Sequence, residues 1–191
     1  IINKLNTISM NTRQYIFLGA IGAIGFVLAF GLGSFVNALT GTPLTGGLVN
    51  GIIVGVILTV GLKSVPKFGA GVIIWIVFSA LAIPTITMGT PGAYKIVVGI
   101  FSGLIWDTVV YLFRRSNAGY IIGSAIGGSA VIIGTLVAAI ILGLPSAEKL
   151  QSAIYLLLGI YGVMGIFSGW LGVSLYNKKL SHLALFKRLT E

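Results

Sequence analysis

The sequence contains few charged residues, and very few of them are acidic. Only 8% of its 191 residues are charged, and only three are Asp or Glu. In soluble domains, charged residues make up about a quarter of the chain. This shortage of charge excludes an ordinary soluble domain. Together with a hydrophobic content of 57%, it indicates an integral membrane protein.

Cysteine is absent, and histidine occurs once, at His182. The chain therefore forms no disulfides and has no thiolate chemistry, and we expect neither a metal site nor a cofactor. The sequence also lacks HExxH, the Walker phosphate-binding motif, GxSxG with triad partners, and paired carboxylates. We therefore expect a protein that is not an enzyme and has no ATPase of its own.

Six long apolar runs predict the fold class. Each run is long enough to cross a bilayer as a helix, which takes roughly 20 residues. The runs are continuous rather than alternating, which argues against the strands of a membrane barrel. We predict an all-α integral membrane protein, with one domain over 1–191 and six transmembrane helices. The predicted helices cover residues 15–38, 46–62, 68–88, 93–113, 119–144 and 152–176.

The positions of the basic residues predict how the protein sits in the cell membrane. Ten of the twelve Lys and Arg flank the apolar runs on one side, and only Lys95 and Lys149 lie on the other. Cytoplasmic loops carry an excess of Lys and Arg. We therefore expect a multi-pass protein with both termini in the cytoplasm. The ten residues are Lys4, Arg13, Lys63, Lys67, Arg114, Arg115, Lys178, Lys179, Lys187 and Arg188.

Residues 177–191 form a basic amphipathic tail, "NKKLSHLALFKRLTE", on the predicted cytoplasmic side. Leucines and a phenylalanine alternate there with basic residues. One interpretation is a short interfacial helix on anionic lipid. The other is a docking surface for a cytoplasmic partner.

Small residues recur at a spacing of four in several predicted helices, and the chain holds 28 glycines. The clearest stripe is Gly47, Gly51, Gly55 and Thr59. Such stripes let membrane helices approach closely. They indicate packing within the bundle, or a face that holds a second membrane subunit. The first helix is the best candidate for a partner-facing stripe.

Asp107 is the one acid inside an apolar run, where a charge costs about 2.5 to 3.5 kcal/mol at the membrane centre. It is either a structural acid, paired with a basic loop residue or a hydroxyl, or part of a proton or ion relay.

Lys95 follows the turn "MGTPGAYK", in which we expect Thr90 to be the N-cap of a helix and Pro91 its first residue. A cation so close to a helix N-terminus opposes the macrodipole. Lys95 therefore either extends to the outer headgroups or contacts an acidic or polar group of a ligand.

The connections on the predicted outer side are rich in Thr, Asn, Gly and Pro, and tyrosines lie beside them. Together, the three outer connections indicate a pocket that is wet at the top and apolar below. The predicted ligand-binding residues are Asn37, Asn50, Thr87, Tyr94, Lys95, Tyr155 and Tyr161.

The chain resembles the substrate-binding S component of an energy-coupling factor (ECF) vitamin transporter. The resemblance lies in the size, the six predicted helices and two segments, "MGTPGAYKIVVGIFSGLIWDTVVYLF" and "GIFSGWLGVSLYNKKLSHLALFKRL". It implies that a vitamin or precursor binds near the outer face. It also implies docking onto a transmembrane coupling subunit that two cytoplasmic ATPases drive. The nearest match to the family's docking stripe is Gly19, Ala23, Gly25 and Ala29.

Three functions are compatible with a small membrane protein of this composition. The first is high-affinity binding of a micronutrient for uptake. The alternative is a structural or assembly subunit of a larger membrane complex. A channel or ion-coupled carrier is disfavoured, because the apolar runs hold a single acid.

Overall fold

The computed structural model describes residues 10–41, 43–86 and 89–190, with the backbone alone at 43–46 and 190. The described residues are helical and form no strand, which confirms the predicted all-α class. The helices are α2 (Thr12–Thr40), α3 (Pro43–Ser64), α4 (Ala70–Ala82), α5 (Tyr94–Leu112), α6 (Asn117–Ile141), α7 (Ala147–Leu175), the π-helix η1 (Tyr176–Leu180) and α8 (Ala184–Thr190).

Five of these helices are long and apolar enough to cross a membrane, and α4 is not among them. The predicted span 68–88 was too long, because α4 has 13 residues and a length of about 20 Å. Pro84 explains the early end, because it has no backbone N–H with which to continue the helix, although Ile83 before it still has helical φ and ψ of −47° and −53°. The helix begins after Gly69, whose φ of 94° belongs to the left-handed region that favours glycine.

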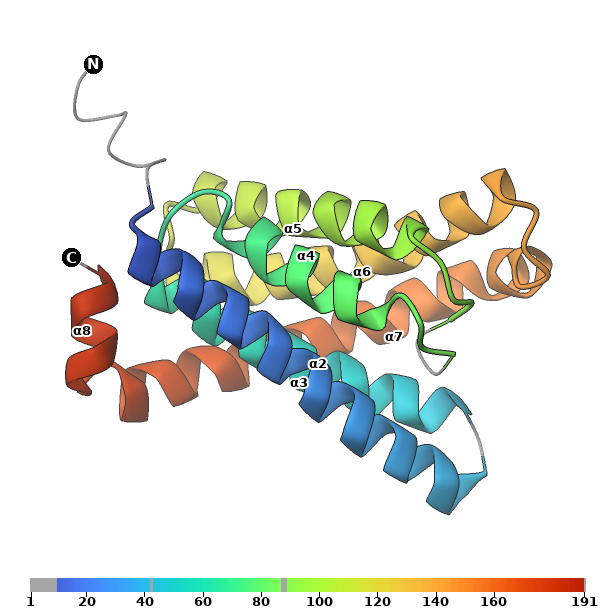
Figure 1. Cartoon of the computed structure of the whole chain (residues 1–191), viewed down its shortest axis with the longest axis horizontal. Helices are drawn as coiled ribbons and strands as arrows, with labels where there is room; N and C mark the ends of the chain where they lie inside the picture. Colours follow the sequence, from blue (N-terminus) through green and yellow to red (C-terminus); the bar gives the residue numbers. More distant parts are fainter. Residues whose placement is uncertain (1–9, 42, 87–88, 191) are drawn as a thin grey trace.

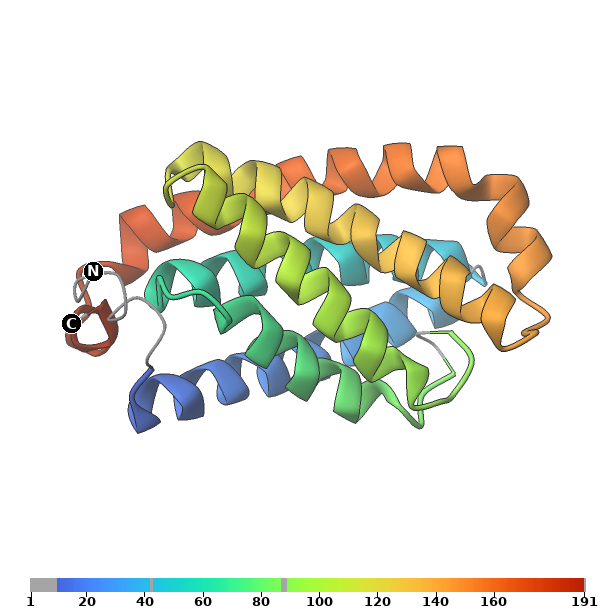
Figure 2. The ribbon, with the colours of Figure 1, turned by 90° about the horizontal axis from the view of Figure 1, so that it is seen from above.

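The six main helices close into a ring. Each packs chiefly on two neighbours, in the order α2, α3, α7, α6, α5, α4 and back to α2. In Figure 2, α2 and α7 lie at opposite edges with α5 and α6 between them. The start of α2 and helix α8 lie at one end, together with the α3–α4 and α5–α6 connections (Figure 1). The α2–α3, α4–α5 and α6–α7 connections lie at the opposite end, which we call the loop end.

Small residues bring the neighbouring helices of the ring close together. A Cβ on Gly103 of α5 would lie 2.8 Å from the Cα of Val72 in α4. A Cβ on Gly169 of α7 would lie 2.9 Å from the Cα of Ile121 in α6. Such distances leave no room for a side chain. These glycines therefore serve packing within the bundle, one of the two roles expected for the stripes.

The four residues predicted to hold a partner do not form one outward face of α2. Gly25 and Ala29 are buried, and Gly19 and Ala23 are partly buried. Gly25 packs near Ile57 of α3 and near α4. Gly25 and Ala29 thus pack within the bundle, because the closing of the ring turns that side of α2 toward α3 and α4, and docking of a partner onto this stripe stays a prediction.

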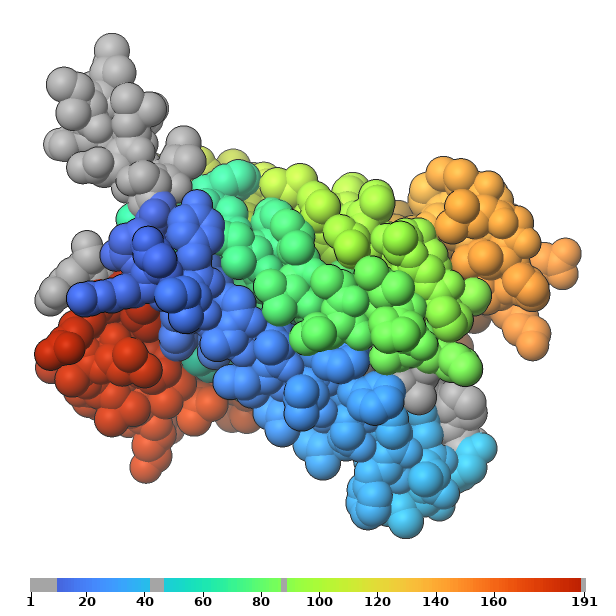
Figure 3. Space-filling view, viewed as in Figure 1, coloured from blue at the N-terminus to red at the C-terminus, as the bar shows by residue number. Residues whose placement is uncertain are grey.

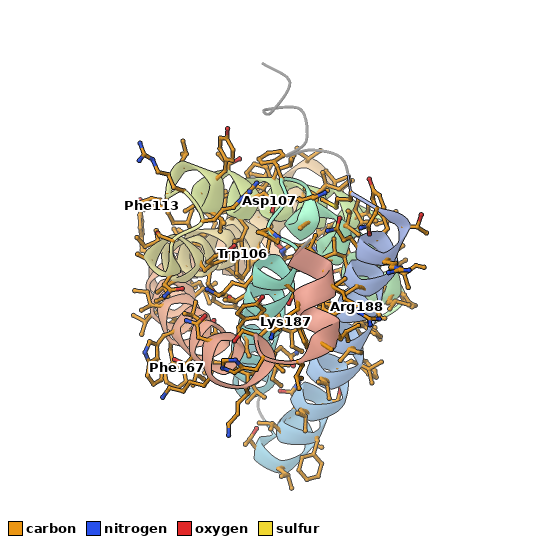
Figure 4. All side chains as sticks on the ribbon, turned by 90° about the vertical axis from the view of Figure 1, so that its left-hand side faces the viewer. Trp106, Asp107, Phe113, Phe167, Lys187 and Arg188 are labelled. Atoms are coloured by element: carbon orange, nitrogen blue, oxygen red, sulfur yellow. The ribbon has the colours of Figure 1, made fainter. Side chains whose placement is uncertain are left out.

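The C-terminal segment folds back onto the end of the bundle. The side-chain amide of Gln14 in α2 donates a hydrogen bond of 2.7 Å to the carbonyl oxygen of Leu189, which is buried. The ring of Phe186 packs edge-on against Phe17, with 5.7 Å between centroids. Lys187 and Arg188 of the same helix remain exposed, and Figure 4 labels them on α8 at this end. The tail thus keeps a basic outer surface while its apolar side holds it to α2.

Asp107 of α5 caps the N-terminus of α4. Its carboxylate accepts backbone N–H bonds of 3.1 Å from Gly69, 3.1 Å from Gly71 and 3.2 Å from Val72. Free N–H groups and the positive end of the macrodipole stabilise an anion at this position. Asp107 is therefore a structural acid: the helix terminus supplies its hydrogen bonds, and the basic loop residue Arg115 adds an electrostatic attraction. It lies inside the bundle, whereas Phe113 and Phe167 lie on the outer edge (Figure 4).

Replacing Asp107 should destabilise the bundle. Asp107→Ala leaves three N–H donors without their acceptor, and we expect a loss of about 3 kcal/mol in the free energy of unfolding. Thermal unfolding in detergent measures it. The control is Thr108→Ala, because the exposed Thr108 hydroxyl bonds only to its own helix at Leu104. Equal stability of the two variants would contradict the capping role.

Candidate functional site

A cavity of about 310 Å³ lies inside the ring of helices. Its wall comes from five helices, α3 to α7, and α2 contributes no residue. The lining includes Gly47 near the start of α3, Ala82 at the end of α4 and Tyr94 at the start of α5. The lining also includes Trp106 and Ser168, so the cavity extends from the loop end into the middle of the bundle. Figure 3 shows the α2–α3 corner, in light blue, and the α6–α7 corner, in orange, spread apart at that end.

Glycines provide much of the space in the cavity. Gly47, Gly51 and Gly55 line it from one face of α3, and Gly99 and Gly128 line it from α5 and α6. The stripe predicted on residues 47–59 therefore forms part of a cavity wall. This role is additional to the packing and partner-holding roles expected from the sequence.

Aromatic side chains form the largest apolar surfaces of the wall. Trp75 and Phe78 of α4 pack edge-on, with 5.4 Å between ring centroids. Trp106 of α5 is 1% exposed and packs on the glycine face of α6. A Cβ on Gly127 would lie 2.6 Å from the Trp106 ring. A pocket of this kind, mostly apolar with a few polar groups, is typical of small-molecule sites.

The wall also carries polar groups. The hydroxyls of Ser124 and Ser168 join α6 to α7 at 3.1 Å. The indole nitrogens of Trp75 and Trp106 are buried and have no hydrogen-bond partner among the described residues. Both nitrogens are covered by protein atoms, so the two tryptophans give the wall apolar ring surface rather than free donors.

Lys95 lies on the wall and binds the C-terminus of α4. It is 8% exposed, and its Nζ donates bonds of 2.9 Å to the Ala82 carbonyl and 2.8 Å to the Thr85 carbonyl. The interpretation as a lysine extending to the headgroups was therefore wrong. The macrodipole that stabilises this cation belongs to α4, whose carbonyl end carries negative partial charge.

The turn before Lys95 also differs from the prediction. The N-cap of α5 is Ala93 rather than Thr90, and no side chain caps the helix. The carbonyl of Thr90 accepts a hydrogen bond of 2.8 Å from the Tyr94 hydroxyl instead. The helix starts later than proline statistics suggest, and this places Lys95 in its first turn, beside the end of α4.

Four of the seven predicted ligand-binding residues line the cavity: Asn50, Tyr94, Lys95 and Tyr161. They come from three different helices, α3, α5 and α7. The side chain of Asn50 also lies against Gly33 of α2. The structure brings these four together, and their contact with a ligand stays a prediction.

Of the other three predicted residues, the two that the structure describes do not line the cavity. Asn37 lies on α2, which takes no part in the wall. Tyr155 is 88% exposed on the outside of α7. Thr87 lies outside the described residues. Asn37 and Tyr155 were both predicted from their place on the outer side, but the helix faces that carry them do not point into the cavity.

Sequence reasoning missed the two tryptophans. Trp75 and Trp106 lie inside their apolar runs, whereas tryptophans that anchor membrane helices lie near the interfaces. Their position in the middle of a run is the one sign in the sequence that they have another role. A position in a run does not show which way a side chain points, so the sequence did not predict that the two tryptophans line one cavity.

Removing the charge of Lys95 should destabilise the protein. Lys95→Met leaves the Ala82 and Thr85 carbonyls without this donor, and we expect a loss of about 1 to 3 kcal/mol in the free energy of unfolding. Lys149→Met is the control, since Lys149 is an exposed lysine near the same end. Thermal unfolding of both variants in detergent checks this, and equal midpoints would refute the capping of α4.

Comparison with known proteins identifies no relative. No family model, no curated protein and no solved structure matches this chain. The function of the cavity therefore has to be argued from its own geometry and from the sequence patterns above.

Proposed function

We propose that this protein binds a small micronutrient, a vitamin or a vitamin precursor, within the cell membrane for uptake into the cell. The observation that carries the proposal is the cavity of about 310 Å³, which five helices line with aromatic and polar side chains. Ligand pockets commonly measure 300 to 1,000 Å³ and have mostly apolar walls with a few polar groups. A purely structural subunit has no need of such a space.

The position of the cavity supports uptake from outside. The start of α2, helix α8 and the basic connections lie at one end of the bundle (Figure 1), and the cavity extends from the middle of the bundle to residues near the other end. With the basic end in the cytoplasm, as the positive-inside rule predicts, the cavity extends from the middle of the membrane toward its outer side. A nutrient arriving from outside then reaches it first.

The energy for uptake comes from partner subunits in this proposal. The sequence has no nucleotide-binding motif, and its one acid in an apolar run is held by three backbone N–H groups. A proton or ion relay through Asp107 is thus disfavoured. The resemblance to an S component supports a transmembrane coupling subunit with cytoplasmic ATPases as the partners.

Purified protein should retain a small molecule. Mass spectrometry after denaturation should detect it in the unmodified protein and find it strongly reduced in Thr135→Trp, because an indole on this wall residue fills the cavity. Val137→Trp, on an exposed position of the same helix, should keep it. A preparation that is always empty, and whose thermal unfolding does not respond to a vitamin panel, would contradict the proposal.

The orientation can be tested separately. The chain has no cysteine, so a single introduced one is a unique label site. Glu148→Cys, at the loop end, should react with an impermeant maleimide on intact cells. His182→Cys, near the C-terminus, should react only after the membrane is opened. Labelling of His182→Cys on intact cells, or of both variants from one side, would contradict the proposed topology.

A further inference from the structure

The wall of the cavity carries positive charge and no negative charge. Its lining residues include Lys95 but no Asp or Glu. Asp107 is close in sequence to Trp106, but its carboxylate is occupied by the N-terminus of α4. A cationic ligand in this cavity therefore lacks a counter-ion among the described residues, and burying an unpaired charge is costly.

The bonds of Lys95 leave one of its donors weakly used. An ammonium group has three N–H donors and no acceptor. Two of them make short bonds to carbonyls, while the contact to the Thr85 hydroxyl is 3.4 Å, beyond the usual range for a good hydrogen bond. Neutral carbonyls do not cancel the charge of the ammonium. A ligand oxygen facing Lys95 therefore gains a donor and an attraction that the protein leaves unused.

Trp75 of α4 provides a second feature of the cavity wall. It lies seven residues before Ala82, so both face the cavity about 10 Å apart along α4. Its indole offers a flat apolar surface, and Phe78, one turn later on α4, adds a second ring to the wall. Tyr161 lines the cavity from α7. A planar ring that stacks on aromatic walls and presents oxygen toward Lys95 fits this arrangement.

We propose that the ligand is a planar ring compound, neutral or anionic, with a carbonyl or carboxylate oxygen that binds Lys95, and that the cavity rejects cations. This inference rests on the proposed binding function, but not on uptake or on partner subunits.

The test uses two series of compounds that share a ring and differ in charge. One is indole-3-acetate, indole-3-acetamide and tryptamine, and the other is benzoate, benzamide and benzylamine. Binding to the purified full chain, freed of any retained molecule, is measured by titration calorimetry in detergent. In at least one series the anion and the amide should bind, and the cation should bind about tenfold or more weakly. Tighter binding of the cation, equal binding of all three, or no binding in either series would overturn the proposal.

Two lysine variants show whether the discrimination comes from Lys95. Lys95→Met should weaken binding of the anion about tenfold and that of the amide less. Lys149→Met removes the same charge without touching the cavity and should change neither. If Lys95→Met does not fold, the two compound series on the unmodified protein still show whether the cavity rejects cations. Binding with the expected order but no association with ATPase subunits would leave this inference standing and contradict the transport function alone.

Discussion

The structure depends on the way α5 holds both ends of α4. Asp107 binds the N–H groups at the start of α4, and Lys95 binds the carbonyls at its end. The two residues are twelve positions apart on α5, about 18 Å along the axis, which matches the length of a 13-residue helix packed antiparallel to it. Each charge faces the end of the macrodipole that stabilises it. Two charges that are costly in an apolar environment are thereby accommodated without pairing with each other.

This arrangement also satisfies the ends of the short helix. The terminal N–H and C=O groups of a helix need partners, above all where water is absent. Asp107 and Lys95 supply them inside the bundle, so the end that Pro84 imposes on α4 at Ala82 has polar partners below the level of the loops. The terminal carbonyls of α4 and the lysine that binds them then become part of the cavity wall.

Glycines have two roles in this fold. Gly103 and Gly169 let neighbouring helices approach closely and so close the ring. Gly51 and Gly55 instead line the cavity. The sequence pattern is the same in both cases, a small residue every fourth position. The difference lies in the opposite surface: Gly103 and Gly169 face backbone atoms, whereas Gly51 and Gly55 face the side chains of Met164 and Ser168 beside the cavity, and this is set by the neighbouring helix.

The helical class and five of the helices could be predicted from the sequence, because apolar runs reflect a local property, the transfer of each segment out of water. Pro84 lies within the third apolar run, but the run continues past it and so predicted a helix longer than α4. Asn50, Tyr94, Lys95 and Tyr161 were found by their depth and polarity, whereas Trp75 and Trp106 were missed and Asn37 and Tyr155 were included wrongly in the wall. Which face of each helix points inward depends on the ring order α2, α3, α7, α6, α5, α4. That order arises from contacts between residues far apart in the chain, so the partners of Lys95 and Asp107 were decided by tertiary structure alone.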